Sequence, residues 1–339
     1  MNLKVLAQSL GVSPAAVSIV RKGRPGVSLQ VRAQIQRALE ENGYAYVPYS
    51  GEDSREKPEF EMTNRNILLL KYYDSSLLVN HNDGFVDSII SSLDATARME
   101  QFTLVINAVS KHDYPRFLRG LSTASWAGVL VIATEMSRDE ILMLEGIPVP
   151  MVILDSDYPN LPFSSVAMDN RSLAFSAVEY LKSRGEVGLL ASRIPTGNFD
   201  ARTAGYREAL NTFGMKYRED IVFHVTPGLS GACQEMQEIL AKGCSVPKAI
   251  FAANDILAVG AMKALIQAGY RVPEDVAIIG VDNTMIAQVS TPTLSSIAFS
   301  RQDIGQLAIR HLLTEICNPN QCPVHFRVGA QLILRDSTD

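Results

Sequence analysis

The sequence has few of the residues that build disulfide, metal or catalytic centres. Four cysteines, five histidines and one tryptophan occur among 339 residues. Cys317 and Cys322 are close in sequence, but no histidine or cysteine partners complete a metal-ligand spacing around them. The histidines are scattered, and the sequence contains neither a phosphate-binding glycine motif nor a nucleophile elbow. These absences predict a protein without a metal, a cofactor or an enzymatic activity.

Long apolar runs are also missing. No charged-then-apolar leader opens the sequence, and no apolar segment approaches the roughly 20 residues of a membrane helix. With 47% hydrophobic and 20% charged residues, the composition is typical of a globular chain with room for a small domain and one or two larger ones. We therefore expect a cytoplasmic protein with no membrane partner.

The N-terminus contains two short helical patterns in close succession. Between positions 3 and 10, apolar residues recur at i, i+3, i+4 and i+7, and Gly11 ends this first helix. Ser13 is a suitable N-cap and Pro14 suits the first helical position, so we expect a second helix from Pro14 to about Val20. This spacing is typical of a helix-turn-helix.

A third helix is expected to close the small N-terminal unit. It starts after Ser28, turns Val31, Ile35 and Leu39 inward, and stops at Asn42 and the glycine that follows. Although the whole chain has a formal net charge of −5, positive charges dominate this segment, as contact with phosphates requires. The cations are Lys4, Arg21, Lys22, Arg24, Arg32 and Arg37. The pattern favours a DNA-binding headpiece; a purely structural three-helix unit is the alternative.

Residues 50–64 are predicted to form a linker. Carboxylates outnumber cations in this segment, and Gly51 and Pro58 interrupt any regular element. The headpiece is therefore expected to be tethered flexibly to the rest of the chain.

Beyond the linker, short apolar runs alternate with longer amphipathic stretches. The runs expected to form buried parallel strands are 66–72, 103–107, 128–133, 151–154, 164–168, 187–191, 221–225, 249–252 and 276–281. The stretches expected to form helices are 84–101, 113–121, 138–145, 172–184, 201–213, 231–242, 255–268 and 304–315. This alternation predicts an α/β body of two doubly wound parallel-sheet subdomains, whose facing strand ends make a ligand cleft.

Several motifs follow one another in order along nearly the whole chain. They are LAQSLGVSPAAVS (6–18), MDN (168–170), DARTAGY (200–206), ANDILAVGA (253–261), GYRVPEDV (269–276), IGVDN (279–283) and TPTLSSI (291–297). In this combination the sequence resembles the lactose-repressor/galactose-repressor (LacI/GalR) family of bacterial transcription regulators. The resemblance implies a dimeric repressor with a periplasmic-binding-protein-like body that closes on a small effector and thereby changes operator affinity. An effector can do so only if it binds the two conformations unequally.

The resemblance assigns DNA contacts to the second helix and its surroundings. The candidates are Ser13, Pro14, Ala15, Ala16, Ser18, Ile19, Arg21, Lys22 and Arg24. Pro14, Ala15 and Ile19 stand where relatives carry polar base readers, so contacts with thymine methyl groups are expected instead of bidentate hydrogen bonds. Ala16 replaces a threonine that contacts phosphate in relatives.

The family's hinge helix has no counterpart in this sequence. After the third helix, relatives have a Tyr-x-Pro-Asn-x-x-Ala-x-x-Leu pattern whose leucine enters the minor groove. Here the acidic linker follows, and no leucine occurs between Leu39 and Leu68. We therefore expect a tether without a groove-bending wedge, because its carboxylates would repel phosphate.

The resemblance also implies an effector site in the cleft. The candidate residues are Tyr73, Phe85, Asp155, Arg202, Asn254, Asp282 and Phe299. Arg202 offers a guanidinium fork and Asp282 accepts hydroxyl hydrogen bonds, so alanine at either position is expected to weaken effector binding with the fold intact. Asp255 is expected to be the N-cap of its helix, with Asn254 facing the cleft. Thr226 stands where sugar-binding relatives often have a stacking tryptophan, so both a sugar-like and a nucleoside-like effector stay open.

Together these patterns divide the chain into a headpiece (1–48), a linker (49–64) and an effector-binding and dimerisation body (65–339). One subdomain of the body is expected at about 65–158 and 293–322, and the other at about 160–290 and 324–337. The expected partners are operator DNA, a small effector and a second copy of the chain. A ligand-binding module of the periplasmic type, without DNA function, is the alternative.

Overall fold

The computed structural model describes residues 3–22, 26–42, 44, 64–74, 84–156, 158, 160–319 and 321–339. Contacts divide the chain into two compact units, 1–63 and 64–339, which are described separately. Arg24 and nearly all of the predicted linker lie outside the described residues. Within those residues, no helix combines the length and the apolarity needed to cross a membrane.

The first unit contains the three helices that the sequence predicts. They are α1 (Leu3–Ser9), α2 (Pro14–Arg21) and α3 (Leu29–Glu41). Gly11 has a positive φ of 65° in the turn after α1, a conformation that favours glycine. Ser13 Oγ accepts a hydrogen bond from the Ala16 amide at 3.1 Å, and Ser28 Oγ accepts one from the Val31 amide at 3.4 Å. These side chains satisfy amides at the starts of α2 and α3 that have no partner within their helices.

A small apolar cluster holds the three helices together. Its buried members are Leu6, Ala7, Val17, Val20, Ile35, Ala38 and Leu39, and Tyr44 packs against them. Arg32 is one of the cations that the sequence offers for phosphate contact, but it is only 3% exposed. The basic surface of the headpiece therefore excludes Arg32, because this position of α3 faces inward.

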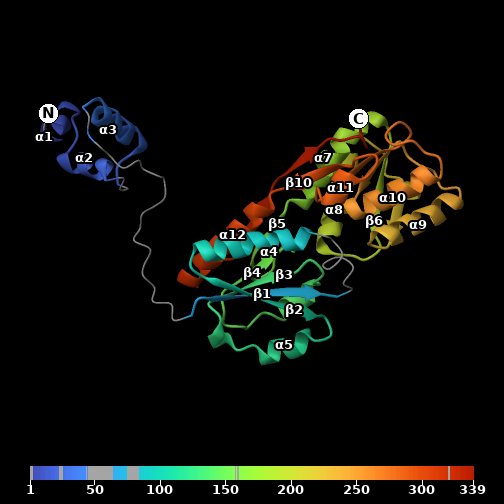
Figure 1. Cartoon of the computed structure of the whole chain (residues 1–339), viewed down its shortest axis with the longest axis horizontal. Coiled ribbons are helices and arrows are strands. Elements are labelled where there is room, and N and C mark those ends of the chain that lie inside the picture. Colours follow the sequence, from blue (N-terminus) through green and yellow to red (C-terminus); the bar gives the residue numbers. More distant parts are fainter. Residues whose placement is uncertain are drawn as a thin grey trace. The chain divides into compact units, whose positions relative to one another are not determined.

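The first sheet of the body has the strand order β11-β5-β4-β3-β1-β2, and all of its strands are parallel (Figure 1). The strands are β1 (Asn66–Tyr73), β2 (Thr103–Ser110), β3 (Gly128–Ile132), β4 (Met151–Leu154), β5 (Ser164–Met168) and β11 (His325–Val328). Helices α4 (Phe85–Met99) and α12 (Arg301–Cys317) cover one face, and α5 (Tyr114–Gly120) and α6 (Arg138–Leu142) cover the other. Alternate residues of β1, β3 and β4 pack toward α5 and α6, as a pleated strand requires.

The second sheet has the order β12-β10-β9-β8-β6-β7, and only β12 is antiparallel to its neighbour among the described strands. Its strands are β6 (Val187–Ser192), β7 (Val222–Val225), β8 (Ala249–Ala252), β9 (Ala277–Val281), β10 (Ser295–Phe299) and β12 (Ala330–Ile333). Its helices are α7 (Asn170–Leu181), α8 (Gly197–Thr212), α9 (Leu229–Ala241), α10 (Asp255–Gln267) and α11 (Met285–Val289). In the described part of the body, short 3₁₀ helices span Thr123–Ser125, Lys182–Arg184 and Glu219–Ile221.

The predicted subdomain boundaries need three corrections. β5 pairs with β4 and β11 pairs with β5, so both strands belong to the first sheet, although the sequence placed them with the second. β10 pairs with β9 and therefore belongs to the second sheet, although residues 293–322 were placed with the first. The chain thus crosses between subdomains after β5, between β10 and α12, and again between β11 and β12. Pairing between strands that are far apart in the sequence leaves no local pattern from which the boundaries could be predicted.

Candidate functional site

Helix α2 carries most of the candidate DNA contacts on one face. Val17 and Val20 point into the headpiece core, whereas the opposite face is open to solvent. The exposed candidates are Ser13, Pro14, Ala15, Ser18, Arg21 and Lys22. Ile19 is half-buried, and Ala16 packs against the core, so its contribution to a DNA surface is limited. The face is apolar in the first turn of α2 and cationic at its end.

The cleft of the body begins where strands of the two sheets end. Asp155 follows β4 in the first sheet, and Asp282 follows β9 in the second. Their φ angles are 53° and 103°, in a region that residues other than glycine seldom adopt. Each aspartate still donates its backbone N–H to a carbonyl of the adjacent strand. Asp155 donates to the Val166 carbonyl at 3.0 Å, and Asp282 donates to the Ile297 carbonyl at 2.9 Å. Such strained backbone at strand ends is typical of binding sites.

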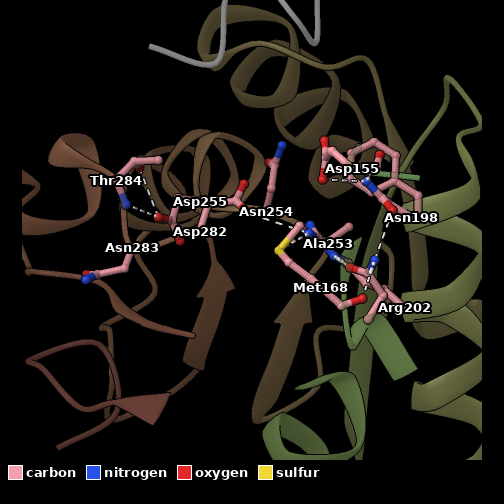
Figure 2. A network of polar contacts seen from close by, with 12 residues as sticks. Asp155, Met168, Asn198, Arg202, Ala253, Asn254, Asp255, Asp282, Asn283 and Thr284 are labelled. Atoms are coloured by element: carbon pink, nitrogen blue, oxygen red, sulfur yellow. Dashed lines mark hydrogen bonds and ion pairs between the residues drawn. The ribbon is translucent and has the colours of Figure 1, made fainter. Parts of the chain in front are cut away.

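Arg202 of α8 is 3% exposed and lies between the two walls of the cleft (Figure 2). Its Nε donates to Asn170 Oδ1 at 2.8 Å and its Nη1 donates to the Ala253 carbonyl. Its Nη2 lies 3.7 Å from Met168 Sδ and 3.5 Å from Asp282 Oδ1. Arg202 therefore also supports the fold, and we revise the expectation that its replacement by alanine leaves the fold intact.

Asn198, also in α8, connects the two subdomains. Its Nδ2 donates to the Asp155 carbonyl at 3.0 Å and to Asp155 Oδ1 at 3.1 Å, and its Oδ1 accepts from Asn170 Nδ2 at 2.9 Å (Figure 2). Thr134 Oγ1 donates to the second carboxylate oxygen of Asp155 at 2.6 Å. The Asp155 carboxylate is thus hydrogen-bonded from both subdomains.

The start of α10 differs from the sequence expectation. Asn254, not Asp255, is the N-cap, since its side chain accepts from the Leu257 amide at 2.9 Å. Asp255 is fully buried and accepts from the Ser296 hydroxyl at 2.5 Å and from the Thr284 amide at 2.7 Å. Asn254 still lines the cleft, so one residue has both the capping and the cleft-facing role.

Burial shifts the ionisation of two of the carboxyl groups. Desolvation raises the pKa of Asp155 to about 6, opposed by its hydrogen bond from Thr134 and by the charge of Arg202. Desolvation raises the pKa of Asp255 to about 7, and the charge of Asp282 adds to this rise. Asp155 and Asp255 therefore hold a proton more readily than an exposed aspartate does.

The cleft is nearly closed. Its lining residues are Phe85, Val86, Thr134, Asp155, Met168, Thr196, Asn198, Phe199, Arg202, Asn254 and Asp282. The free volume among them is about 30 Å³, which has room for roughly two water molecules. Entry of a sugar-sized molecule therefore requires the two walls to separate. Within the described ranges, no group of three or more histidine, cysteine, aspartate or glutamate residues could hold a metal ion.

Five of the seven candidate effector residues line the cleft, and two do not. Phe299 packs behind Phe85, with ring centroids 5.7 Å apart. Tyr73 lies elsewhere: it pairs with Ser110 of the edge strand β2 and lines a separate cavity of about 590 Å³ beside Trp126. The structure therefore places Tyr73 beside the cavity at β2 and not among the residues that line the cleft.

Sequence reasoning missed several residues that the fold brings to the cleft. They are Val86, Thr134, Met168, Thr196, Asn198 and Phe199. Two of them could have been predicted from their proximity to the family motifs. Met168 opens the MDN motif, and Asn198 lies two residues before DARTAGY. Thr134 carries no such signal.

Comparison with known proteins defines the class of this chain. A periplasmic binding protein-like domain matches residues 178–338. The HTH-type transcriptional repressor CytR of Escherichia coli (strain K12) is 27% identical over 99% of this chain and 96% of its own length. The HTH-type transcriptional repressor PurR of Escherichia coli O1:K1 / APEC is 29% identical over 77% of this chain and 82% of its own.

Solved structures agree in fold over the whole length. The transcriptional regulator CelR in its cellobiose complex has a TM-score of 0.72 at 26% identity and covers 99% of both chains. The lac repressor dimer bound to operator and the anti-inducer ONPF has a TM-score of 0.69 at 21% identity, covering 100% of this chain and 99% of its own. A helix-turn-helix unit followed by a periplasmic-binding-protein-like body thus identifies a transcriptional regulator. Over nearly its whole length, the chain is similar to HTH-type transcriptional repressors and to the lac repressor.

Proposed function

We propose that this regulator is a cytoplasmic, homodimeric repressor that binds a palindromic operator through α2 and responds to a small effector held in the cleft. The observation that carries the proposal is the cleft itself: Arg202, Asp155 and Asp282 converge between two sheets at strand ends. A regulator needs both a ligand-responsive joint and a DNA-contacting surface, and the outward face of α2 supplies the latter.

The effector is proposed to be rich in hydroxyl groups. Carboxylate and amide oxygens accept hydroxyl hydrogen bonds, and a guanidinium donates them, while Phe85 and Phe199 offer apolar surface to a ring. CelR has been solved with cellobiose, which supports a sugar or a sugar derivative. A nucleoside-like molecule is the second candidate, because the aromatic side chains also suit a purine or pyrimidine face.

The DNA proposal is tested by selecting duplexes from a random library with the full chain and measuring affinity at two salt concentrations. Arg21→Gln and Lys22→Gln should each weaken binding and reduce the salt slope by about 1, because each removes a phosphate contact. Lys242→Gln, an exposed lysine beyond α9, is the matched control. Failure to select any duplex, or equal losses in all three variants, would contradict the proposal.

The effector proposal is tested by thermal-shift screening of cellobiose, monosaccharides, sugar phosphates and nucleosides on the full chain. Asp282→Asn should weaken the best ligand by about 1.5–3 kcal/mol, because it removes a charged acceptor. Asparagine tolerates the positive φ at this position, so the backbone should be retained. Asp139→Asn, at an exposed carboxylate in α6, is the control. Equal affinity in both variants would move the site away from Asp282.

A further inference from the structure

Arg301 is a second arginine at the cleft margin that the proposed function does not use. It is the first residue of α12, where the helix dipole favours negative charge, so its position needs another explanation. Its guanidinium carbon lies 5.7 Å from the ring centroid of Phe85 and 5.5 Å from that of Phe299. Contact with two aromatic rings stabilises the cation at this unfavourable place.

The polar contacts of Arg301 reach across the subdomains. Its Nη2 donates to the backbone carbonyl of Asp282, at the end of β9 in the second sheet. Among the described residues its buried Nε has no hydrogen-bond partner, so the bond to the Asp282 carbonyl and the two rings hold the group in place. Phe85 opens α4 of the first subdomain, and Phe299 ends β10 of the second. Arg301 thus contacts both sides of the joint.

The first turn of α12 is fixed on α4. Ser92 Oγ of α4 donates to the carbonyl of Gln302 at 3.0 Å. Gly305 allows the close approach, since a Cβ at this position would lie 2.2 Å from Ser92 Oγ. Whatever moves Arg301 therefore moves the α4–α12 pair as one body, because packed helices do not deform continuously.

We propose that Arg301 is a positioning residue that ties the backbone of Asp282 to the α4–α12 pair, so that a shift of Asp282 on effector binding is transmitted to the first subdomain. The proposal rests on the proposed role of Asp282 in the cleft. The φ of Asp282 is strained at 103°. Loss of the hydrogen bond from Arg301 to the Asp282 carbonyl should therefore let this backbone relax.

Hydrogen–deuterium exchange on the full chain, without ligand or DNA, tests the tie. Arg301→Ala should speed exchange about tenfold in residues 282–289 and 85–92 and leave β3 and β8 unchanged, because local opening sets the rate. Methylguanidinium should restore protection, whereas methylammonium should not, since only the former has a planar fork. Arg310→Ala, at an exposed arginine of the same helix, is the matched control.

The outcomes separate the tie from simple destabilisation. Unchanged exchange, equal acceleration throughout the body, or equal rescue by methylammonium would each overturn the proposal. If Arg301→Ala does not fold, Arg301→Met retains contact with the rings and should still lose protection at 282–289. Because no effector is present, the result is independent of whether the cleft binds a sugar. Loss of effector binding in Asp282→Asn tests the proposed function separately.

Discussion

The headpiece and the cleft present their functional groups in opposite ways. On α2, six candidate contacts are exposed around two buried valines. In the cleft, Asp155, Arg202 and Asp282 are 1%, 3% and 3% exposed. An exposed surface needs only a folded helix beneath it, whereas buried charges must satisfy one another or destabilise the fold. Substitutions in the cleft should therefore change stability as well as binding, and substitutions of the exposed α2 residues should change binding alone.

The largest expected effect is at Arg202. Arg202→Ala should lower the free energy of unfolding by about 3–5 kcal/mol, because it removes the buried donor to the Asn170 and Ala253 oxygens and the guanidinium that lies 3.5 Å from the Asp282 carboxylate. Urea unfolding followed by the fluorescence of Trp126, the only tryptophan, measures the change. The control is Arg171→Ala, which breaks an exposed ion pair with Glu208 and should cost about 0–1 kcal/mol. Equally small losses would show that the cleft network does not support the fold.

The same contrast explains what the sequence could predict. The helices of the headpiece follow from Gly11, Ser13 and Pro14, whose effects are local. All nine predicted strands of the body and its eight predicted helices are present, because apolar periodicity is also local. The elements β10, β11, β12 and α11 were not predicted.

The cleft was predicted less completely, because it is built by contacts between distant residues. Family motifs indicated Arg202 and Asp282, and both line the cleft. Asn198, 43 positions from its partner Asp155, and Arg301, 19 positions from Asp282, were not found. Arg301 carries no local pattern that distinguishes it from a surface side chain, and Asn198 is marked only by its proximity to the DARTAGY motif.

A second, smaller effect concerns the pH dependence of stability. Burial holds the pKa of Asp155 at about 6, above the ordinary value of 3.8, so the folded chain binds this proton more tightly than the unfolded chain. The contribution of this proton to the free energy of unfolding is then complete below about pH 4, and it is lost as the pH rises through about 6. Asp155→Asn removes this dependence and should gain about 2 kcal/mol relative to the native chain between pH 4 and pH 7.

Asparagine suits this position on structural grounds. An asparagine at position 155 can still accept the hydrogen bond from Asn198. Its amide can donate to the Thr134 hydroxyl, which donates to the carboxylate in the native chain. Asparagine also tolerates the φ of 53°. Urea unfolding at four pH values measures the difference between variant and native chain. The exposed Asp139→Asn variant is the control. A difference that stays constant from pH 4 to pH 7 would mean that Asp155 is ionised throughout.

The smallest expected effect is on the DNA affinity of the headpiece. The first turn of α2 exposes Pro14 and Ala15, which have no side-chain donor or acceptor, so any direct reading of bases there must be apolar. Replacing thymine by uracil removes a single methyl group from a selected operator. At each contacted position this should cost about 0.8 kcal/mol, the value of one buried CH₂ group, with the salt slope unchanged. Fluorescence anisotropy with operators substituted one thymine at a time measures it, and thymines outside the half-sites are the control. If no substitution inside the half-sites weakens binding, the headpiece recognises DNA through phosphates and shape alone, and its apolar turn has no role in specificity.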